Sequence, residues 1–244
     1  MFVHTERAGS TSLRPVVLVH GAGGSSATWF MQLRGLRQAA HVVAIDLNGH
    51  GSTPDRNEPD VTQSYIDDVD KVVGEFDRPV LVGHSMGGAI AQLYALSYPR
   101  KIGGLILVGT GARLRVNPLI FDLLDRDFDS YVTSMASYVF AEGADTEMVE
   151  ASIAEMRKCP SSVVKRDFEV CNRFDIMDRV QEIVVPTLIV VGDKDVMTPV
   201  KYSTFLRDRI RDSKLAVISD AGHMVMLERH REFNSAVAGW LNEL

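Results

Sequence analysis

The chain has few cysteines, no long apolar run and no excess of positive charge. Its 244 residues include two cysteines, Cys159 and Cys171, which are too few for a disulfide framework and lack the spacing of a zinc site. No segment approaches the roughly 18 apolar residues that a membrane-spanning helix needs, and residues 1–13 hold no apolar stretch of signal-peptide length. We therefore expect a cytoplasmic protein that keeps both thiols reduced.

The charge balance excludes further classes of partner. Lys and Arg total 26 and Asp and Glu total 32, so the formal net charge is −6. An acidic protein of this kind offers no basic face to nucleic acid and no polybasic segment to an anionic membrane. Apolar residues make up 45% of the chain, which is enough for a sizeable core. We expect a folded protein that acts on a small molecule, as a monomer or a homodimer.

Six short apolar runs predict the strands of one sheet. None of them alternates with polar residues, and they cover residues 15–19, 41–45, 79–82, 102–108, 186–191 and 215–218. Continuous apolar strands are typical of a parallel sheet that helices cover on both faces. Helical patterns lie between the runs, and a short strand near residues 2–5 is expected at an antiparallel edge. The fold class is therefore α/β, with an open, mostly parallel sheet and helices on both faces.

One long stretch interrupts this alternation. Residues 113–180 contain no convincing strand, whereas their apolar pairs suit helices, and Pro118 and Pro160 resemble first-turn prolines. The stretch is too long for an ordinary loop. We expect a helical lid inserted after the fourth parallel strand, which divides the α/β core into residues 1–112 and 181–244. A separate helical domain is the alternative, although the strand pattern resumes directly at residue 186.

The strongest motif of the chain is Gly83-His84-Ser85-Met86-Gly87-Gly88. It follows an apolar run and opens a helical pattern, which is the context in which Gly-x-Ser-x-Gly presents a nucleophilic serine on a sharp turn. A side chain in place of either flanking glycine would crowd that turn. The backbone N–H of Met86, directly after the serine, is expected to be one donor of an oxyanion hole. The motif therefore predicts Ser85 as a catalytic nucleophile.

The chain resembles the α/β-hydrolase fold superfamily, and in particular its small lidded esterase-like members. Four further motifs carry the resemblance: His20-Gly21-Ala22-Gly23-Gly24, Asp46-Leu47-Asn48-Gly49-His50-Gly51-Ser52, Gly192-Asp193-Lys194-Asp195 and Gly222-His223. Each follows a predicted strand, and the chain order of serine, acid and histidine is that of this fold. The second motif departs from many relatives, which have proline where this chain has Asn48, in a loop that is structural in the family.

The resemblance implies the remaining catalytic roles. His223 is the expected base, Asp195 is the acid that orients it, and the backbone N–H of Ala22 is the second oxyanion donor. Asp193 is expected to be a turn residue. The other six histidines are His4, His20, His41, His50, His84 and His230. We assign them to loop scaffolding or to no motif, and we expect His84, which adjoins the serine, to face elsewhere. No metal and no organic cofactor is expected.

Apolar residues beside these motifs predict the substrate pocket. Trp29 follows the first glycine-rich loop, Met197 follows the acid and Met224 follows the base. The lid adds aromatic residues: Phe121, Phe128, Tyr131, Tyr138, Phe140 and Phe168. These side chains predict an adaptable apolar acyl pocket, with plain core filling as the alternative reading. Arg113 and Arg115 are either solvated surface or contacts for an anionic substrate.

These observations favour a carboxylic-ester hydrolase. It would cleave small to medium, largely apolar acyl substrates through an acyl-enzyme on Ser85. A thioesterase, a C–C bond hydrolase, a lyase and a perhydrolase share the triad and remain alternatives. A ligand receptor that keeps the triad is an alternative of a different class. Haloalkane dehalogenases and epoxide hydrolases of this fold use aspartate as nucleophile, so the serine disfavours both.

Overall fold

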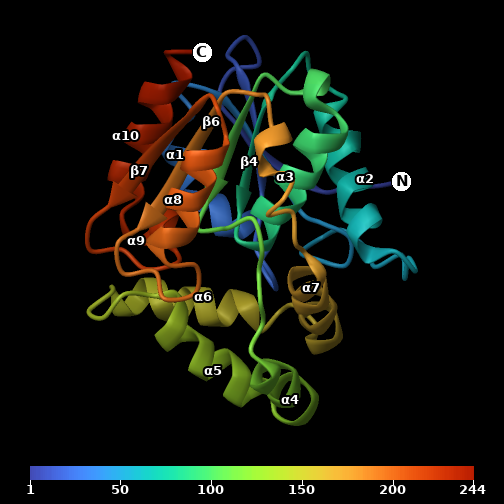
Figure 1. Ribbon diagram of the computed structural model, residues 1–244. Coiled ribbons are helices and arrows are strands. Elements are labelled where there is room, and N and C mark those ends of the chain that lie inside the picture. The colour runs from blue at the N-terminus through green and yellow to red at the C-terminus, as the bar shows by residue number, and fades with distance from the viewer.

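A seven-stranded sheet in the order β1-β3-β2-β4-β5-β6-β7 runs through the protein (Figure 1). The computed structural model describes residues 1–244. The strands are β1 (Thr5–Ala8), β2 (Pro15–Val19), β3 (His41–Ile45), β4 (Val80–His84), β5 (Gly104–Val108), β6 (Thr187–Gly192) and β7 (Ser213–Ile218). β1 pairs antiparallel with β3, and all other neighbours are parallel. The six predicted parallel strands are confirmed, whereas the edge strand begins three residues later than the residues 2–5 expected for it.

The sheet separates two apolar layers, which explains why its strands lack polar alternation. Val17 and Val19 of β2 point into one layer, while Val16 and Leu18 point into the other. Successive side chains of a strand face opposite sides of the sheet, so a strand buried on both faces must be apolar at every position. The central strands β2 to β6 are buried almost throughout.

Helices cover both faces of the sheet. One apolar layer takes residues from α2 (Val61–Val73), α3 (Met86–Ser97) and α8 (Val200–Arg209). The other takes residues from the short helices η1 (Ser26–Trp29) and α9 (Val225–Glu228), and from α10 (His230–Leu241). The remaining elements are α1 (Phe30–Gly35), η2 (Pro99–Lys101) and η3 (Val180–Glu182). α1 contacts α10 and so lies on the second face.

Four helices connect β5 to β6 and lie together at the carboxyl end of the sheet (Figure 1). They are α4 (Pro118–Arg126), α5 (Phe128–Val139), α6 (Thr146–Met156) and α7 (Ser161–Arg173). Pro118 occupies the first turn of α4, as predicted, but Pro160 is one position earlier, at the N-cap of α7. Cys159 and Cys171 are both free and buried. The helices share an apolar cluster of their own, and an isolated bridge from Arg113 to Asp175 joins the two ends of the insertion.

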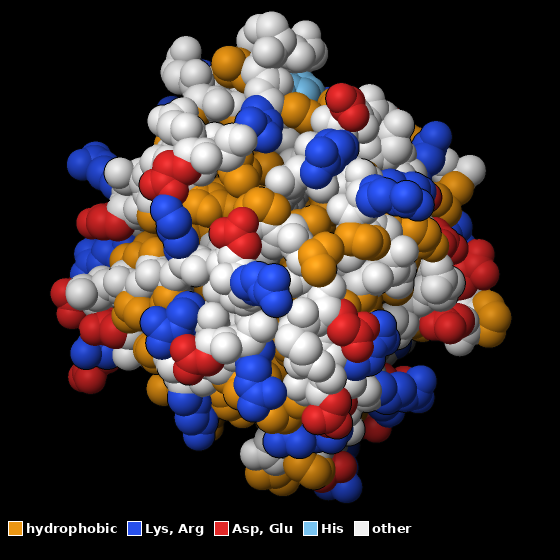
Figure 2. Space-filling model, turned by 45° about the horizontal axis from the view of Figure 1, so that its top comes forward, with side chains coloured by type: hydrophobic (Ala, Val, Ile, Leu, Met, Phe, Trp, Pro, Cys, Tyr) orange, Lys and Arg blue, Asp and Glu red, His pale blue; other side chains and the backbone are white.

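The surface mixes charges of both signs. Figure 2 shows Lys and Arg side chains interspersed with Asp and Glu over the face drawn, without a large patch of one sign. No helix of the protein has both the length and the apolar character needed to cross a bilayer.

Candidate active site

Ser85 lies on a strained turn between β4 and α3. Its φ is 52° and its ψ is −116°, a conformation that non-glycine residues avoid unless their surroundings impose it. Its N–H donates to the carbonyl of Val108 at 2.9 Å, and the hydroxyl of Thr110 donates to its carbonyl at 2.9 Å. A Cβ atom on Gly83 would lie 2.2 Å from the carbonyl oxygen of Gly87. The turn can therefore close only with glycine at that position, and it presents the Ser85 side chain to a cavity.

Asp195 and His223 form a buried pair at the ends of neighbouring strands. Nδ1 of His223 lies 2.9 Å from Oδ2 of Asp195, so Nδ1 carries the hydrogen and Nε2 is left as an acceptor. The carboxylate also accepts from the N–H of Met197 and from both the N–H and the hydroxyl of Thr198. Burial alone would raise the pKa of Asp195, but His223 and the Thr198 donors together hold it below its usual value. The acid therefore stays ionised beside the imidazole.

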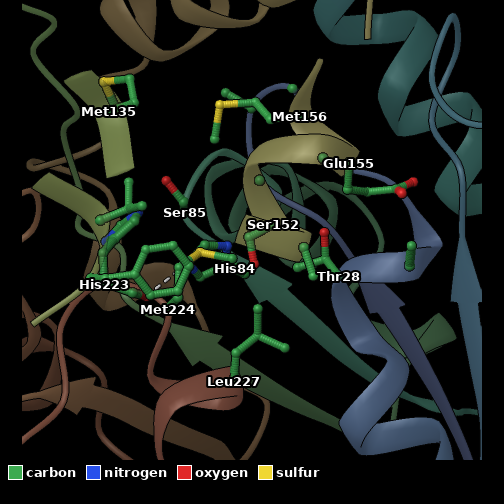
Figure 3. Close-up of a pocket in the computed structure, with 18 of the residues that line it drawn as sticks. Thr28, His84, Ser85, Met135, Ser152, Glu155, Met156, His223, Met224 and Leu227 are labelled. Carbon is green, nitrogen blue, oxygen red and sulfur yellow. Dashed lines mark hydrogen bonds between the residues drawn. The ribbon is translucent and has the colours of Figure 1, made fainter. Parts of the chain in front are cut away.

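Ser85 and His223 line the same cavity (Figure 3). Close packing also brings the two expected oxyanion donors to this place. A Cβ atom on Gly87 would lie 2.4 Å from the carbonyl oxygens of Val19 and His20, so the start of α3 lies directly against the end of β2. The N–H groups of Ala22 and Met86 donate to no acceptor within the chain. Two free donors beside a serine hydroxyl are what an oxyanion hole requires.

His84 contacts His223, a contact that the sequence reasoning missed. The expectation that His84 faces elsewhere is wrong, because its side chain lines the cavity and its ring centroid lies 4.7 Å from that of His223. Burial, with the nearby His223, lowers the pKa of His84 to about 3. The neutral ring donates from Nε2 to the backbone carbonyl of His223 at 3.0 Å. No local pattern links positions so far apart in the chain.

The cavity has a volume of about 630 Å³, and 16 of its 27 lining residues are hydrophobic. Met197 and Met224 line it, as predicted. Trp29 does not, because its side chain is fully buried in the core with an edge toward His84. Of the predicted lid aromatics, those that line the cavity are Tyr131, Phe140 and Phe168. Methionines of α5 and α6 that also line it are Met135, Met148 and Met156.

The charges in the cavity are acidic. Glu6 and Glu155 are its only carboxylates, and no Lys or Arg lines it. Arg113 and Arg115 instead lie at the surface, where both pair with Asp175. This settles the two alternatives for the arginines, since neither reaches the cavity. No group of three or more His, Cys, Asp or Glu side chains is arranged to hold a metal ion.

A serine on a strand–turn–helix elbow above a mostly parallel sheet is the architecture of an α/β-fold hydrolase. A sequence profile described as the alpha/beta hydrolase family matches residues 16–236. The chain belongs to this family, and the protein is a hydrolase.

Individual relatives cover nearly the whole chain. It is 25% identical to a pimeloyl-[acyl-carrier protein] methyl ester esterase of Neisseria meningitidis serogroup A, over 91% of this chain and 75% of the relative. It is 27% identical to the proline iminopeptidase PfmaB of Pestalotiopsis fici, over 88% and 87%. Among solved structures, a thermophilic esterase superposes with a TM-score of 0.82 at 34% identity, covering 99% of this chain and 98% of that one.

Proposed function

We propose that the protein hydrolyses carboxylic esters of uncharged, largely apolar acyl groups. The observation that carries the proposal is Ser85 on its strained elbow, in one cavity with the His223–Asp195 pair. The esterases among the relatives and the solved structures support the choice of an ester over other acyl substrates.

In the proposed reaction, Oγ of Ser85 attacks the acyl carbonyl carbon while Nε2 of His223 takes the hydroxyl proton. The N–H groups of Ala22 and Met86 stabilise the negative charge that develops on the carbonyl oxygen, each by roughly 3 kcal/mol. The ester C–O bond then breaks, and the imidazolium returns its proton to the leaving alcohol. Water attacks the acyl-enzyme in the same way and releases the acid. Asp195 holds the imidazole tautomer and stabilises its charged form throughout.

Residues 113–180 act in this proposal as a lid that supplies half of the hydrophobic residues of the acyl pocket. Helices α5, α6 and α7 contribute apolar side chains to the cavity, whereas the core contributes the reacting groups. Figure 3 shows Glu155, Ser152 and Thr28 toward the side of the cavity opposite His223. A carboxylate at the end of an acyl chain would meet Glu155 without a cation in the cavity to offset it. The proposed substrates are therefore uncharged.

The first test measures the hydrolysis of p-nitrophenyl esters of increasing acyl length. Turnover should vanish in Ser85→Ala and persist in the matched control Ser97→Ala, which removes an exposed serine at the other end of α3. At equal chain length, an ester with a terminal carboxylate should react more slowly than its neutral counterpart.

Labelling with a fluorophosphonate separates the alternatives. A wild-type protein that takes the label on Ser85 but cleaves no ester would redirect the assignment to a thioesterase, C–C hydrolase, lyase, perhydrolase or receptor. A wild-type protein that resists the label would overturn the assignment of an activated serine.

A further inference from the structure

A carboxylate of the lid lies behind the glycine-rich loop that carries Ala22. Asp167 is on α7, which contacts α2 and α3 of the core (Figure 1). Its side chain is fully buried. Oδ2 accepts from the backbone N–H of Gly23 at 2.8 Å and from Nε2 of His50 at 2.8 Å. Oδ1 accepts from the hydroxyl of Tyr65 at 2.5 Å. All of these partners belong to the core, so one lid side chain joins three core segments.

The charge of this carboxylate is balanced locally. Burial alone would lower the pKa of His50, but Asp167 raises it to about 10, so His50 is a cation at neutral pH. The His50 cation, the Tyr65 hydroxyl and the Gly23 N–H hold the pKa of Asp167 below its usual value, although burial opposes them. A buried ion pair whose oxygens are all hydrogen-bonded has one preferred geometry. The position of the Gly23 N–H is therefore fixed relative to α7.

The Gly23 contact sets the direction of the peptide group that follows Ala22. The carbonyl of Gly21 accepts from Nδ1 of His20 at 2.8 Å and from the N–H of Gly24 at 3.1 Å. The peptide bond is planar, so this fixes the opposed N–H of Ala22. The next peptide unit, which joins the Ala22 carbonyl to the Gly23 N–H, is held only by Asp167. If it rotated, the Ala22 carbonyl would change direction beside the oxyanion site.

We propose that Asp167 is a positioning residue for the oxyanion hole: with lid helix α7 docked on the core, it holds the Ala22 carbonyl in the direction that leaves the hole open to an oxyanion. This inference rests on the proposed function, because it assigns a role in stabilising an oxyanion formed at Ser85. A purely structural role for the buried pair is the competing explanation. The positioning role depends on where Asp167 places an acceptor oxygen for the Gly23 N–H. The structural role depends on the negative charge that pairs with His50.

Two substitutions separate placement from charge. Asp167→Asn removes the charge but keeps an acceptor oxygen in place for Gly23. Asp167→Glu keeps the charge but moves the carboxylate away by one methylene group. If Asp167 positions the loop, the Glu variant should lose kcat by roughly 100-fold, because a turned Ala22 carbonyl would oppose the oxyanion about as strongly as one donor stabilises it, with KM within about threefold. The Asn variant should retain kcat within about tenfold of wild type. A charge role alone predicts the reverse order and would overturn the proposal.

Asp55→Asn is the matched control. Asp55 holds the neighbouring Arg166 of α7 through contacts of 2.8 Å, but it does not touch the loop. Loosening α7 in this way should leave kcat within about threefold of wild type. An equal loss of kcat in Asp55→Asn and Asp167→Glu would show that general lid docking matters, and it would overturn the proposal. If the Glu variant does not fold, Asp167→Ser replaces it, with the same loss expected relative to Asp167→Asn.

The rate of fluorophosphonate labelling of Ser85 provides a readout that needs no ester substrate. Phosphonylation also develops negative charge on an oxygen that the hole would stabilise. The labelling rate should follow the same order, with wild type and Asp167→Asn above Asp167→Glu. This order without any ester turnover would refute the proposed function while supporting the positioning role. Equal labelling rates in the two variants would refute the positioning role.

Discussion

Raising the pH should destabilise the protein through one buried proton on His50. Because Asp167 raises the folded-state pKa of His50 to about 10 from its usual value of about 6.5, the native state keeps this proton over a range in which the unfolded chain has lost it. The stabilisation is complete below the unfolded-state pKa and is lost as the pH rises toward the folded-state pKa. The neighbouring His20 stays neutral, since burial and the His50 charge lower its pKa to about 4.

The magnitude follows from the number of protons bound. Where the native state holds one more proton than the unfolded state, the free energy of unfolding falls by about 1.4 kcal/mol per pH unit. Between about pH 7 and about pH 9.5 the loss from His50 should therefore be about 3 kcal/mol, comparable to the roughly 3–5 kcal/mol that breaking a buried ion pair costs. Burial of Cys171 raises the pKa of its thiol, which adds to the fall in wild type and variants alike.

Urea unfolding at several pH values measures this effect by comparison with His50→Gln. The variant keeps a hydrogen-bond donor near Asp167 but cannot take up the proton, so the difference in slope isolates His50. His4→Gln, at the edge of the sheet, is the control for removing an imidazole outside the network. Parallel stability curves for wild type and His50→Gln between pH 7 and 9.5 would refute the ion pair.

Three further substitutions test the supports of the catalytic groups. Thr198→Val removes a hydroxyl that donates to Asp195 at 2.8 Å. Because a hydrogen bond to a charged group contributes about 1.5 kcal/mol, kcat should fall roughly tenfold in a steady-state ester assay, with KM unchanged. Gly21→Ala would place a methyl group 3.2 Å from Cβ of Ser85, so kcat should fall and thermal unfolding should show about 1–3 kcal/mol of overpacking. The carboxylate of Glu228 accepts from the backbone N–H groups of Ala141 at 2.8 Å and Gly222 at 3.0 Å. Glu228→Gln would turn a side-chain NH₂ group toward one of these donors. Hydrogen exchange of the two backbone N–H groups should become faster, and the free energy of unfolding should fall by about 1–3 kcal/mol.

The strands, and the meeting of Ser85, Asp195 and His223 at one place, were predictable because both depend on short stretches of sequence. A strand buried on two faces must be apolar at nearly every position, and the parallel strands β2 to β6 are buried almost throughout. The edge strand β7 is less buried and leaves Val217 exposed. Ser85 follows β4 directly, and Asp195 and His223 lie in the loops just after β6 and β7. Parallel strands bring their carboxyl ends to one edge of the sheet. The 2.9 Å contact between Asp195 and His223 therefore follows from topology and local motifs, as does the place of Ser85 in the same cavity.

The direction of individual side chains was less predictable. Trp29 was expected in the pocket, but a large apolar ring beside a loop is equally able to fill the core, and there it packs against Phe233. His84 was expected to face away from the site, yet the tight approach of Gly21 leaves its ring beside His223. In both cases the outcome depends on which neighbour fills the remaining space, and that neighbour is distant in sequence.

Asp167 differs from these two cases because the sequence does carry a signal for it. The buried positions of α7 are Val163, Val164, Asp167, Phe168, Val170 and Cys171, which follow helical spacing on one face. An ionised residue in the middle of an apolar stripe must be paired, because an isolated buried charge is too costly to keep. The helix pattern therefore predicts a buried cationic or hydrogen-bonding partner for Asp167. The partners that the fold supplies lie 102 to 144 residues away in the chain, and one of them is the backbone that positions the proposed oxyanion hole. A carboxylate that served only to pair a histidine would not need to accept from that loop. Oδ2 of Asp167 accepts from both His50 and Gly23. This shared acceptor is the physical reason to connect the docking of α7 with the proposed catalysis.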